Sequence, residues 1–329
     1  MMNFCTSYGA NYIHKGLVLY ESLRKVESAF TMYVMAFDKE TYDFLNKLSL
    51  PNLVVDNFDD IETDELREVK KDRTRSEYCW TVGPFLTEHF IVKYNLESIA
   101  FIDADMMFYT SPKVIFDEIG DNSVAITLHD MEKKIDQSKY IVQFEFFRND
   151  ENGMKCLRWW RDRCIEWCYC RIEDGKFGDQ GYLEQFEKLF NKVYVLRNHA
   201  ACVSIVNKDT LKPVDRSMEF RGVVTPVVIY HYLNTKFEIK DEKTLELVEV
   251  GGRLSKEWLA FYEDYCKMMI YVYNTYLGKN LVNYRIHVWS RTKVLYHWIK
   301  GKLRNNPIAQ WLYYKVFNVK QPAKETNQI

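Results

Sequence analysis

The most constraining feature of this sequence is a short apolar run that stops abruptly at two carboxylates. Ile99 to Ile102 has the length of a buried strand, and Asp103 and Asp105 follow it directly. Alternate side chains of an extended segment share a face, so the two carboxylates can hold one divalent cation together with diphosphate oxygens. A solvated turn after a strand is the alternative for an isolated Asp-x-Asp.

The segments before this run alternate between strand-like and helix-like patterns. They lie at residues 2–7, 12–25, 30–37, 41–48 and 52–55. Strand-helix alternation predicts an α/β fold with a mostly parallel sheet and right-handed crossovers. Ligands of such sheets collect at the C-terminal ends of the strands, where Ser7, Asp38 and Asp103 all fall.

Two further polar sites follow downstream. Asp179 and Gln180 come after a glycine-rich turn and open a predicted helix, so both side chains stand at a helix N-terminus. The alternative for Asp179 is a helix N-cap. His231 ends an apolar strand at 227–232, and a lone histidine in such a strand is more often a core residue than a ligand.

The segment 59–77 is densely charged and reads as a solvated helix with a basic end. Arg73 and Arg75 in that end can reach phosphate, and a plain surface role is the alternative. The remaining predicted elements are helices at 81–94, 114–119 and 152–170, and strands at 124–128, 140–147 and 193–196. The strand at 140–147 alternates apolar and polar residues, which suits an antiparallel strand.

Cysteine usage and hydropathy bear on the compartment. The eight cysteines show no paired Cys-x-x-Cys spacing. Cys164, Cys168 and Cys170 cluster in one predicted helix, where reduced buried thiols are the favoured interpretation and a zinc site the alternative. No apolar stretch reaches the roughly 18 residues that cross a bilayer, and the first residues lack the pattern of a signal peptide. We therefore expect a cytoplasmic protein.

The charge is spread unevenly along the chain. The formal net charge is −1, yet from Val250 onward Lys and Arg exceed Asp and Glu by nine. The pattern of that part predicts helices. The first carries an aromatic stripe expected to dock on the core, formed by Trp258, Tyr262, Tyr265 and Met269. Basic amphipathic segments follow at 293–304 and 306–317. Such segments predict peripheral contact with the inner face of the cytoplasmic membrane. Docking or dimerisation is the alternative, and the acidic main body argues against nucleic acid.

Several short motifs then fall in one order along residues 2–237. They are Phe4-Cys-Thr6, Asn11-Tyr12, Leu19–Leu23, Arg73–Thr81, Phe101-Ile-Asp-Ala-Asp105, Phe147–Asp150, Trp159-Trp160, Phe177-Gly-Asp-Gln180 and Tyr230-His231. With this set the chain resembles a bacterial nucleotide-diphospho-sugar transferase of the GT-A fold, similar to glycosyltransferase family 8. The resemblance implies a mixed, mostly parallel sheet flanked by helices and a helical C-terminal extension. It implies a nucleotide-sugar-binding part at 1–125, an acceptor-side part at 126–240 and a helical, basic region at 241–329.

The resemblance also implies roles for individual residues. Asp103 and Asp105 match the metal motif and His231 a further ligand, a donor set that suits Mn²⁺ or Mg²⁺. Asp179 and Gln180 match a catalytic pair beside the donor sugar. The residues expected to bind the nucleotide and its diphosphate are Thr6, Ser7, Asn11, Tyr12, Asp38, Arg73, Arg75, Asp103 and Ala104.

The activity implied is the transfer of a sugar from a nucleotide diphosphate, usually UDP, to an acceptor hydroxyl. The acceptor is expected to be a glycan or a lipid-linked glycan in bacterial surface glycan synthesis, and the anomeric configuration to be retained. An inverting enzyme with Asp179 as general base is one alternative. Another is a non-catalytic nucleotide-sugar binding protein, because Ile141-Val-Gln143 stands where related enzymes commonly show Asn-x-Gly.

Overall fold

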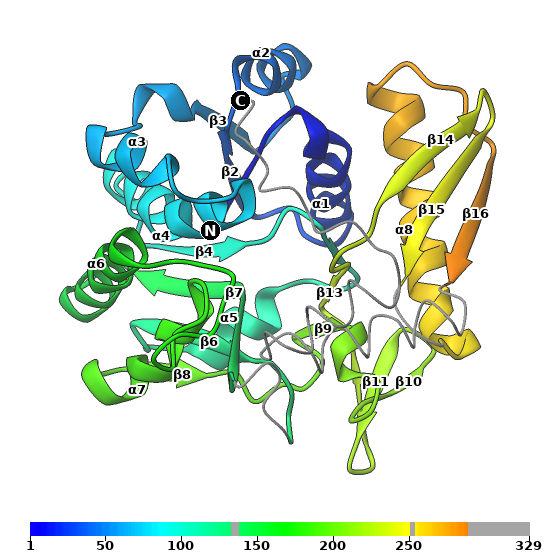
Figure 1. Ribbon diagram of the computed structural model, residues 1–329. Coiled ribbons are helices and arrows are strands. Elements are labelled where there is room, and N and C mark those ends of the chain that lie inside the picture. The colour runs from blue at the N-terminus through cyan, green and yellow to red at the C-terminus, as the bar shows by residue number, and fades with distance from the viewer. Residues whose placement is uncertain (133–137, 251–253, 289–329) are drawn as a thin grey trace, which may run out of the picture.

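The computed structural model describes residues 1–132, 138–250 and 254–288 and is built around a seven-stranded sheet (Figure 1). The strand order is β3-β2-β1-β4-β7-β6-β8. Their bounds are β1 (Met2–Tyr8), β2 (Phe30–Ala36), β3 (Leu53–Asn57), β4 (Ser98–Ile102), β6 (Val124–Leu128), β7 (Tyr140–Arg148) and β8 (Val193–Val195). The first four strands in this order run parallel, and β7 lies antiparallel between β4 and β6. The expected mixed, mostly parallel sheet is therefore confirmed.

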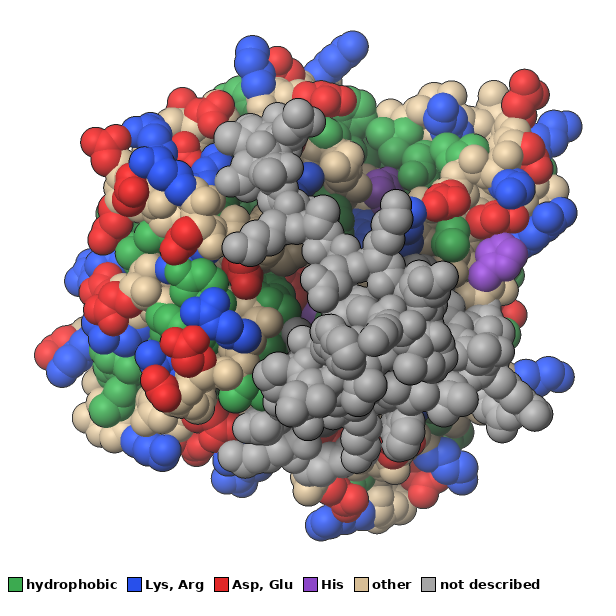
Figure 2. Space-filling view, viewed as in Figure 1, with side chains coloured by type: hydrophobic (Ala, Val, Ile, Leu, Met, Phe, Trp, Pro, Cys, Tyr) green, Lys and Arg blue, Asp and Glu red, His purple; other side chains and the backbone are tan. Residues whose placement is uncertain are grey.

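Helices cover both faces of this sheet because successive side chains of each strand point to opposite sides. On β1, Phe4 packs into the core beside α1 (Ile13–Val26), whereas its neighbour Cys5 packs into the core beside α4 (Arg75–Lys93) and α6 (Glu151–Glu166). The shorter helices are α2 (Lys39–Leu48), α3 (Asp64–Lys70), α5 (Lys113–Ile119) and α7 (Phe186–Leu189). Figure 2 shows side chains of both charge signs interspersed over the visible surface around these helices.

Two helix boundaries differ from those expected from the sequence. Helix α4 begins at Arg75 rather than at residue 81, because Thr74 and Glu77 form a capping box. Helix α6 ends at Glu166, so Cys168 and Cys170 lie beyond it. The eight cysteines all lie in the described residues and form no disulfide there, and the metal-ligand grouping found in that part includes none of them. The interpretation as reduced thiols fits these observations.

A small second sheet joins two distant parts of the chain. It consists of β5 (Met106–Phe108), β13 (Ile229–His231) and β9 (Cys202–Ser204), with β13 in the middle. Strand β5 follows β4 after a loop of only three residues, Asp103 to Asp105. A separate sheet is formed by β10 (Lys212–Val214), β11 (Ser217–Phe220) and β12 (Val223–Pro226).

The region from residue 241 onward is not all helical, which corrects the expectation for it. Helix α8 (Lys256–Tyr276) is present, and its expected stripe of Trp258, Tyr262, Tyr265 and Met269 is buried. It is accompanied by a sheet of β14 (Phe237–Asp241), β15 (Thr244–Val250) and β16 (Asn283–Val288). The physical reason is that Leu245 and Leu247, two residues apart, lie on one face of an extended segment and are completely buried.

The predicted basic segments at 293–304 and 306–317 lie outside the described residues. Among the helices that the structure does describe, none combines the length and the apolar character that a membrane crossing requires.

Candidate functional site

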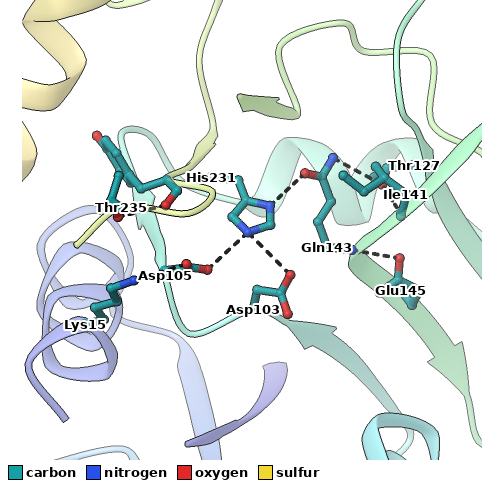
Figure 3. A network of polar contacts seen from close by, with 10 residues as sticks. Lys15, Asp103, Asp105, Thr127, Ile141, Gln143, Glu145, His231 and Thr235 are labelled. Carbon is teal, nitrogen blue, oxygen red and sulfur yellow. Dashed lines mark hydrogen bonds and ion pairs between the residues drawn. The ribbon is translucent and has the colours of Figure 1, made fainter. Parts of the chain in front are cut away.

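The loop between β4 and β5 forms one side of a cluster of three potential metal ligands. Single ligand atoms of Asp103, Asp105 and His231 all lie within 4.8 Å of one another. His231 Nε2 is 3.1 Å from Asp105 Oδ1 and 3.4 Å from Asp103 Oδ2 (Figure 3). Two carboxylates and one imidazole are a donor set that can bind a divalent cation such as Mn²⁺. The Asp103 side chain is 35% exposed, so the group is open to solvent.

Strand pairing brings His231 to the loop. In the antiparallel pair of β13 and β5, His231 lies opposite Met106, the residue directly after Asp105. The next amide along, Tyr232 N, donates to the carbonyl of Asp105 at 2.9 Å. The loop backbone and the histidine are therefore held by the same ladder, and the three predicted ligands meet.

Gln143 on β7 holds the other nitrogen of the imidazole, and sequence reasoning missed this residue as part of the site. Its Oε1 lies 3.2 Å from His231 Nδ1, and its amide nitrogen donates to Thr127 Oγ1 at 3.4 Å. With its amide hydrogens directed to Thr127, Gln143 accepts from Nδ1–H and leaves Nε2 facing the carboxylates. The sequence held one signal for Gln143: it and Glu145 are polar residues in a strand composed largely of apolar ones. The structure shows that both are buried.

The protein environment separates the pKa values of these groups. Although the Asp103 side chain is 35% exposed, the protein around it removes enough water to raise its pKa to about 6, and the neighbouring His231 acts to lower it. Burial also acts to raise the pKa of Asp105, but the hydrogen bond and charge of His231, together with Lys15, hold it below its usual value. For His231, burial lowers the pKa, and the hydrogen bond and charge of Asp105 outweigh this and raise it. Asp105 is therefore the carboxylate most strongly held in its charged form.

Lys15 is a second residue that the sequence did not indicate. It lies on α1 and is 3% exposed, with its Nζ 3.4 Å from Asp105 Oδ2 (Figure 3). The same Nζ lies 4.3 Å from the centre of the Tyr12 ring. A buried ammonium group therefore stands beside the candidate ligands.

Asp179 lies at the N-cap position of a 3-10 helix, η3 (Gln180–Gln185), and its carboxylate makes no capping hydrogen bond in the described structure. The alternative of a simple N-cap is thus not supported. Burial, with the charge of Asp103 added, raises the pKa of Asp179 to about 8. The fully buried Glu145 feels the charges of both Asp103 and Asp179, and its pKa is raised, mainly by burial. Asp179 therefore lies close enough to Asp103 to feel its charge, and the catalytic roles of Asp179 and Gln180 stay predictions.

The other predicted nucleotide contacts have varied environments. Both Asp38 oxygens accept from backbone amides, those of Ala10 at 2.9 Å and Thr41 at 2.8 Å. Gly9 is packed closely against this carboxylate, because a Cβ there would lie 2.5 Å from Asp38 Oδ2 and 3.2 Å from an Arg75 nitrogen. Asp38 and Arg75 therefore shape the loop after β1, in which Asn11 and Tyr12 form part of a short 3-10 helix, η1 (Ala10–Tyr12). Of the other residues expected to bind the nucleotide, Thr6 and Ala104 are buried and Ser7 is half-buried.

Arg73 does not fit its predicted phosphate contact. It is 5% exposed, and its guanidinium donates to the carbonyl oxygens of Cys164, at 2.8 Å, and Ile165. These carbonyls belong to the last turn of α6, where a cation satisfies groups that lack helical partners. We therefore correct the expectation and assign Arg73 a structural role between α4 and α6.

Known structures share this architecture. The galactosyltransferase LgtC, solved with donor and acceptor sugar analogues, aligns with a TM-score of 0.52 and 13% identity over 82% of this chain and 95% of LgtC. The apo form of the glycosyltransferase GlyE of Streptococcus pneumoniae TIGR4 aligns with a TM-score of 0.51 and 12% identity, covering 83% of this chain and 63% of GlyE. The sheet, the loop carboxylates and these likenesses define a protein of the GT-A glycosyltransferase fold.

Sequence relatives are found in Bacillus subtilis (strain 168). The uncharacterized protein YfnF is 33% identical over 202 residues, which are 58% of this chain and 67% of YfnF. The uncharacterized protein YfnD is 25% identical over 278 residues, 78% of this chain and 89% of YfnD. The chain belongs to the same family as YfnF. No family model matches it, and membership of glycosyltransferase family 8 stays a prediction.

Proposed function

We propose that this protein is a metal-dependent glycosyltransferase that moves a sugar from a nucleoside diphosphate, UDP in the first instance, to an acceptor hydroxyl. The observation that carries this proposal is the group of Asp103, Asp105 and His231 at the end of a central strand of a GT-A fold. In open α/β sheets this edge is where nucleotides bind.

Asp103, Asp105 and His231 would hold the cation, Mn²⁺ or Mg²⁺. When bound, such a cation neutralises the charge that develops on the departing diphosphate. The three side chains come from both proposed parts of the domain, the nucleotide-sugar-binding part at 1–125 and the acceptor-side part at 126–240. The chain's own contribution is to hold Nε2 and the two carboxylates toward one point, with Gln143 fixing the ring.

Asp179 and Gln180 are proposed to hold the donor sugar, in a reaction that retains the anomeric configuration. The pKa of about 8 for Asp179 supports this choice. Below that pH the carboxyl keeps its proton, so it donates a hydrogen bond to a sugar hydroxyl and is a poor acceptor for the proton of an attacking hydroxyl. An inverting reaction would need Asp179 as its base, and NMR analysis of the anomeric proton of the product separates the two.

The acceptor is proposed to be a glycan or a lipid-linked glycan of the bacterial surface, reached from the cytoplasmic side. Support comes from LgtC, which was solved with an acceptor sugar analogue. The basic segments proposed to contact the membrane fall in 289–329, outside the described residues.

The test is turnover of a panel of UDP-sugars with Mn²⁺, followed as release of UDP and transfer to a glycan acceptor panel. We expect Asp105→Asn to abolish transfer, and Asp117→Asn, an exposed carboxylate on α5 paired with Lys113, to leave it unchanged. Metal-dependent UDP binding without turnover of any donor would overturn the proposal of an enzyme and favour a nucleotide-sugar binding protein.

A further inference from the structure

Lys15 lies in an unusual place for a lysine. It lies in a stretch of α1 that is buried almost all round, on the same helix face as the buried Val18 and Leu19, and its side chain is 4% exposed. Burying an ammonium group costs free energy unless a counter-charge compensates for it. The compensating charge is the Asp105 carboxylate, at 3.4 Å (Figure 3).

The two oxygens of Asp105 face different partners. Oδ1 lies 3.1 Å from His231 Nε2, on the side of the candidate metal ligands. Oδ2 faces Lys15 Nζ on the opposite side. A cation bound between Asp103, Asp105 and His231 would therefore share the Asp105 charge with the ammonium group of Lys15, and two positive charges would meet at one carboxylate.

Charge balance shows what Lys15 gains from a ligand. Two carboxylates balance one divalent cation, which leaves the ammonium group of Lys15 without compensation in a buried position. A diphosphate that adds oxygens to the shell of the cation brings negative charge to the same place, within the range of a lysine side chain beside Asp105.

Resting on the proposed function, we propose that Lys15 is an exchange cation that pairs with Asp105 in the metal-free protein and with the donor diphosphate once a divalent cation is bound. Lys15 then opposes the binding of the cation alone and favours the binding of cation and diphosphate together. The two ligands are coupled, each increasing the affinity for the other. Lys15 thereby takes the place that the sequence predicted for Arg73.

The proposal predicts effects of opposite sign for one substitution. Lys15→Met should bind Mn²⁺ alone about threefold to tenfold more tightly, because a competing positive charge is removed. In saturating Mn²⁺ it should bind UDP about tenfold or more weakly, because a charge-assisted contact is lost. Uridine, which has no phosphate, should bind the variant and the wild-type protein equally. Calorimetry of the folded full-length chain measures all three affinities without turnover.

Two variants serve as controls. Lys15→Arg keeps the charge and should preserve most of the UDP affinity. Lys93→Met removes another lysine paired with an aspartate, Asp56 at 2.8 Å, and should change neither affinity. If Lys15→Met does not fold, as judged by circular dichroism, Lys15→Gln carries the same test with a smaller polar side chain.

The outcomes separate the two proposals. If the wild-type protein does not bind UDP in the presence of Mn²⁺, the proposed function fails, whatever Lys15 does. If the wild-type protein binds UDP and Lys15→Met shifts both affinities in the same direction, or neither of them, the inference about Lys15 is wrong and the proposed function stands.

Discussion

His231 Nε2 lies 3.1 Å from Asp105 Oδ1, although 126 residues separate the two in the chain. The contact follows from one strand pairing, in which β13 lies antiparallel to β5 and places His231 opposite Met106. The ligand group thus depends on a ladder of backbone hydrogen bonds and not on the three-residue loop alone.

Removing any one of the three ligands should weaken Mn²⁺ binding about 100-fold or more, because each supplies one donor atom to a small shell. The variants are Asp103→Asn, Asp105→Asn and His231→Ala, and the measurement is calorimetric titration with Mn²⁺. Asp117→Asn is the control and should bind as the wild-type protein does. Unchanged affinity in all three variants would mean that the cation binds elsewhere.

Gln143→Leu should weaken Mn²⁺ binding about tenfold, because Nδ1 loses the acceptor that fixes the tautomer of His231. Gln143→Glu keeps an acceptor at that place and should retain more affinity than Gln143→Leu. The affinities come from the same titration, with thermal unfolding recorded for each variant. Equal affinity in the leucine variant and the wild-type protein would contradict a role for Gln143 in orienting the ring.

Asp179→Ala should lower kcat/KM about 100-fold, whereas Asp179→Asn should lose about tenfold or less. The reason is that a protonated Asp179 acts as a hydrogen-bond donor, which an amide can replace and a methyl group cannot. Initial rates with the best UDP-sugar measure this. If the asparagine variant is as inactive as the alanine variant and the wild-type enzyme inverts the anomeric configuration of its product, Asp179 is instead a general base.

Glu145→Gln should stabilise the protein at neutral pH by a few degrees in Tm. The pKa of Glu145 is raised in the folded state, and its Oε2 has no hydrogen-bond partner within the described residues. Above the pKa of the unfolded chain, the unfolded state releases a proton that the folded state retains, so stability falls as the pH rises. The difference in Tm between Glu145→Gln and the wild-type protein should therefore become smaller as the pH is lowered from 7.5 to 4.5. A gain independent of pH would contradict this account.

Asp56→Asn should destabilise the protein at pH 7 by about 1–2 kcal/mol. Burial raises the pKa of Asp56, but hydrogen bonds from His89, Lys93 and Tyr94, each at 2.8 Å, outweigh it and lower the pKa to about 2. A depressed pKa gives stability that is present above the pKa of the unfolded chain, near 4, and is lost as the pH falls toward 2. Urea unfolding measures the free energy of unfolding of both proteins at pH 7 and pH 3. The difference between Asp56→Asn and the wild-type protein should be smaller at pH 3.

The local pattern of the sequence predicts much of the fold and part of the site. Apolar runs bounded by polar turns locate β1, β2, β4 and β6, because buried parallel strands need little else. The same apolar runs make Asp103 and Asp105 recognisable as candidate ligands, because they place both charges directly after a buried strand.

Lys15, Gln143 and Glu145 were missed because their roles depend on contacts between distant elements. Lys15 resembles any helical lysine until α1 is placed against the loop after β4. Arg73 illustrates the converse error, since a basic segment near a phosphate site indicates a ligand until its carbonyl partners on α6 are known. The strands β15 and β16 were missed because residues 241–288 were interpreted from the helical pattern of α8 alone.

The central position of β13, between β5 and β9, has a consequence for biosynthesis. The two carboxylates leave the ribosome first, and their imidazole partner follows 126 residues after Asp105. Under the proposed function, a nascent chain would bind the cation only after β13 has paired with β5. A polypeptide that ends before β13 would carry the two carboxylates of the loop without their third ligand.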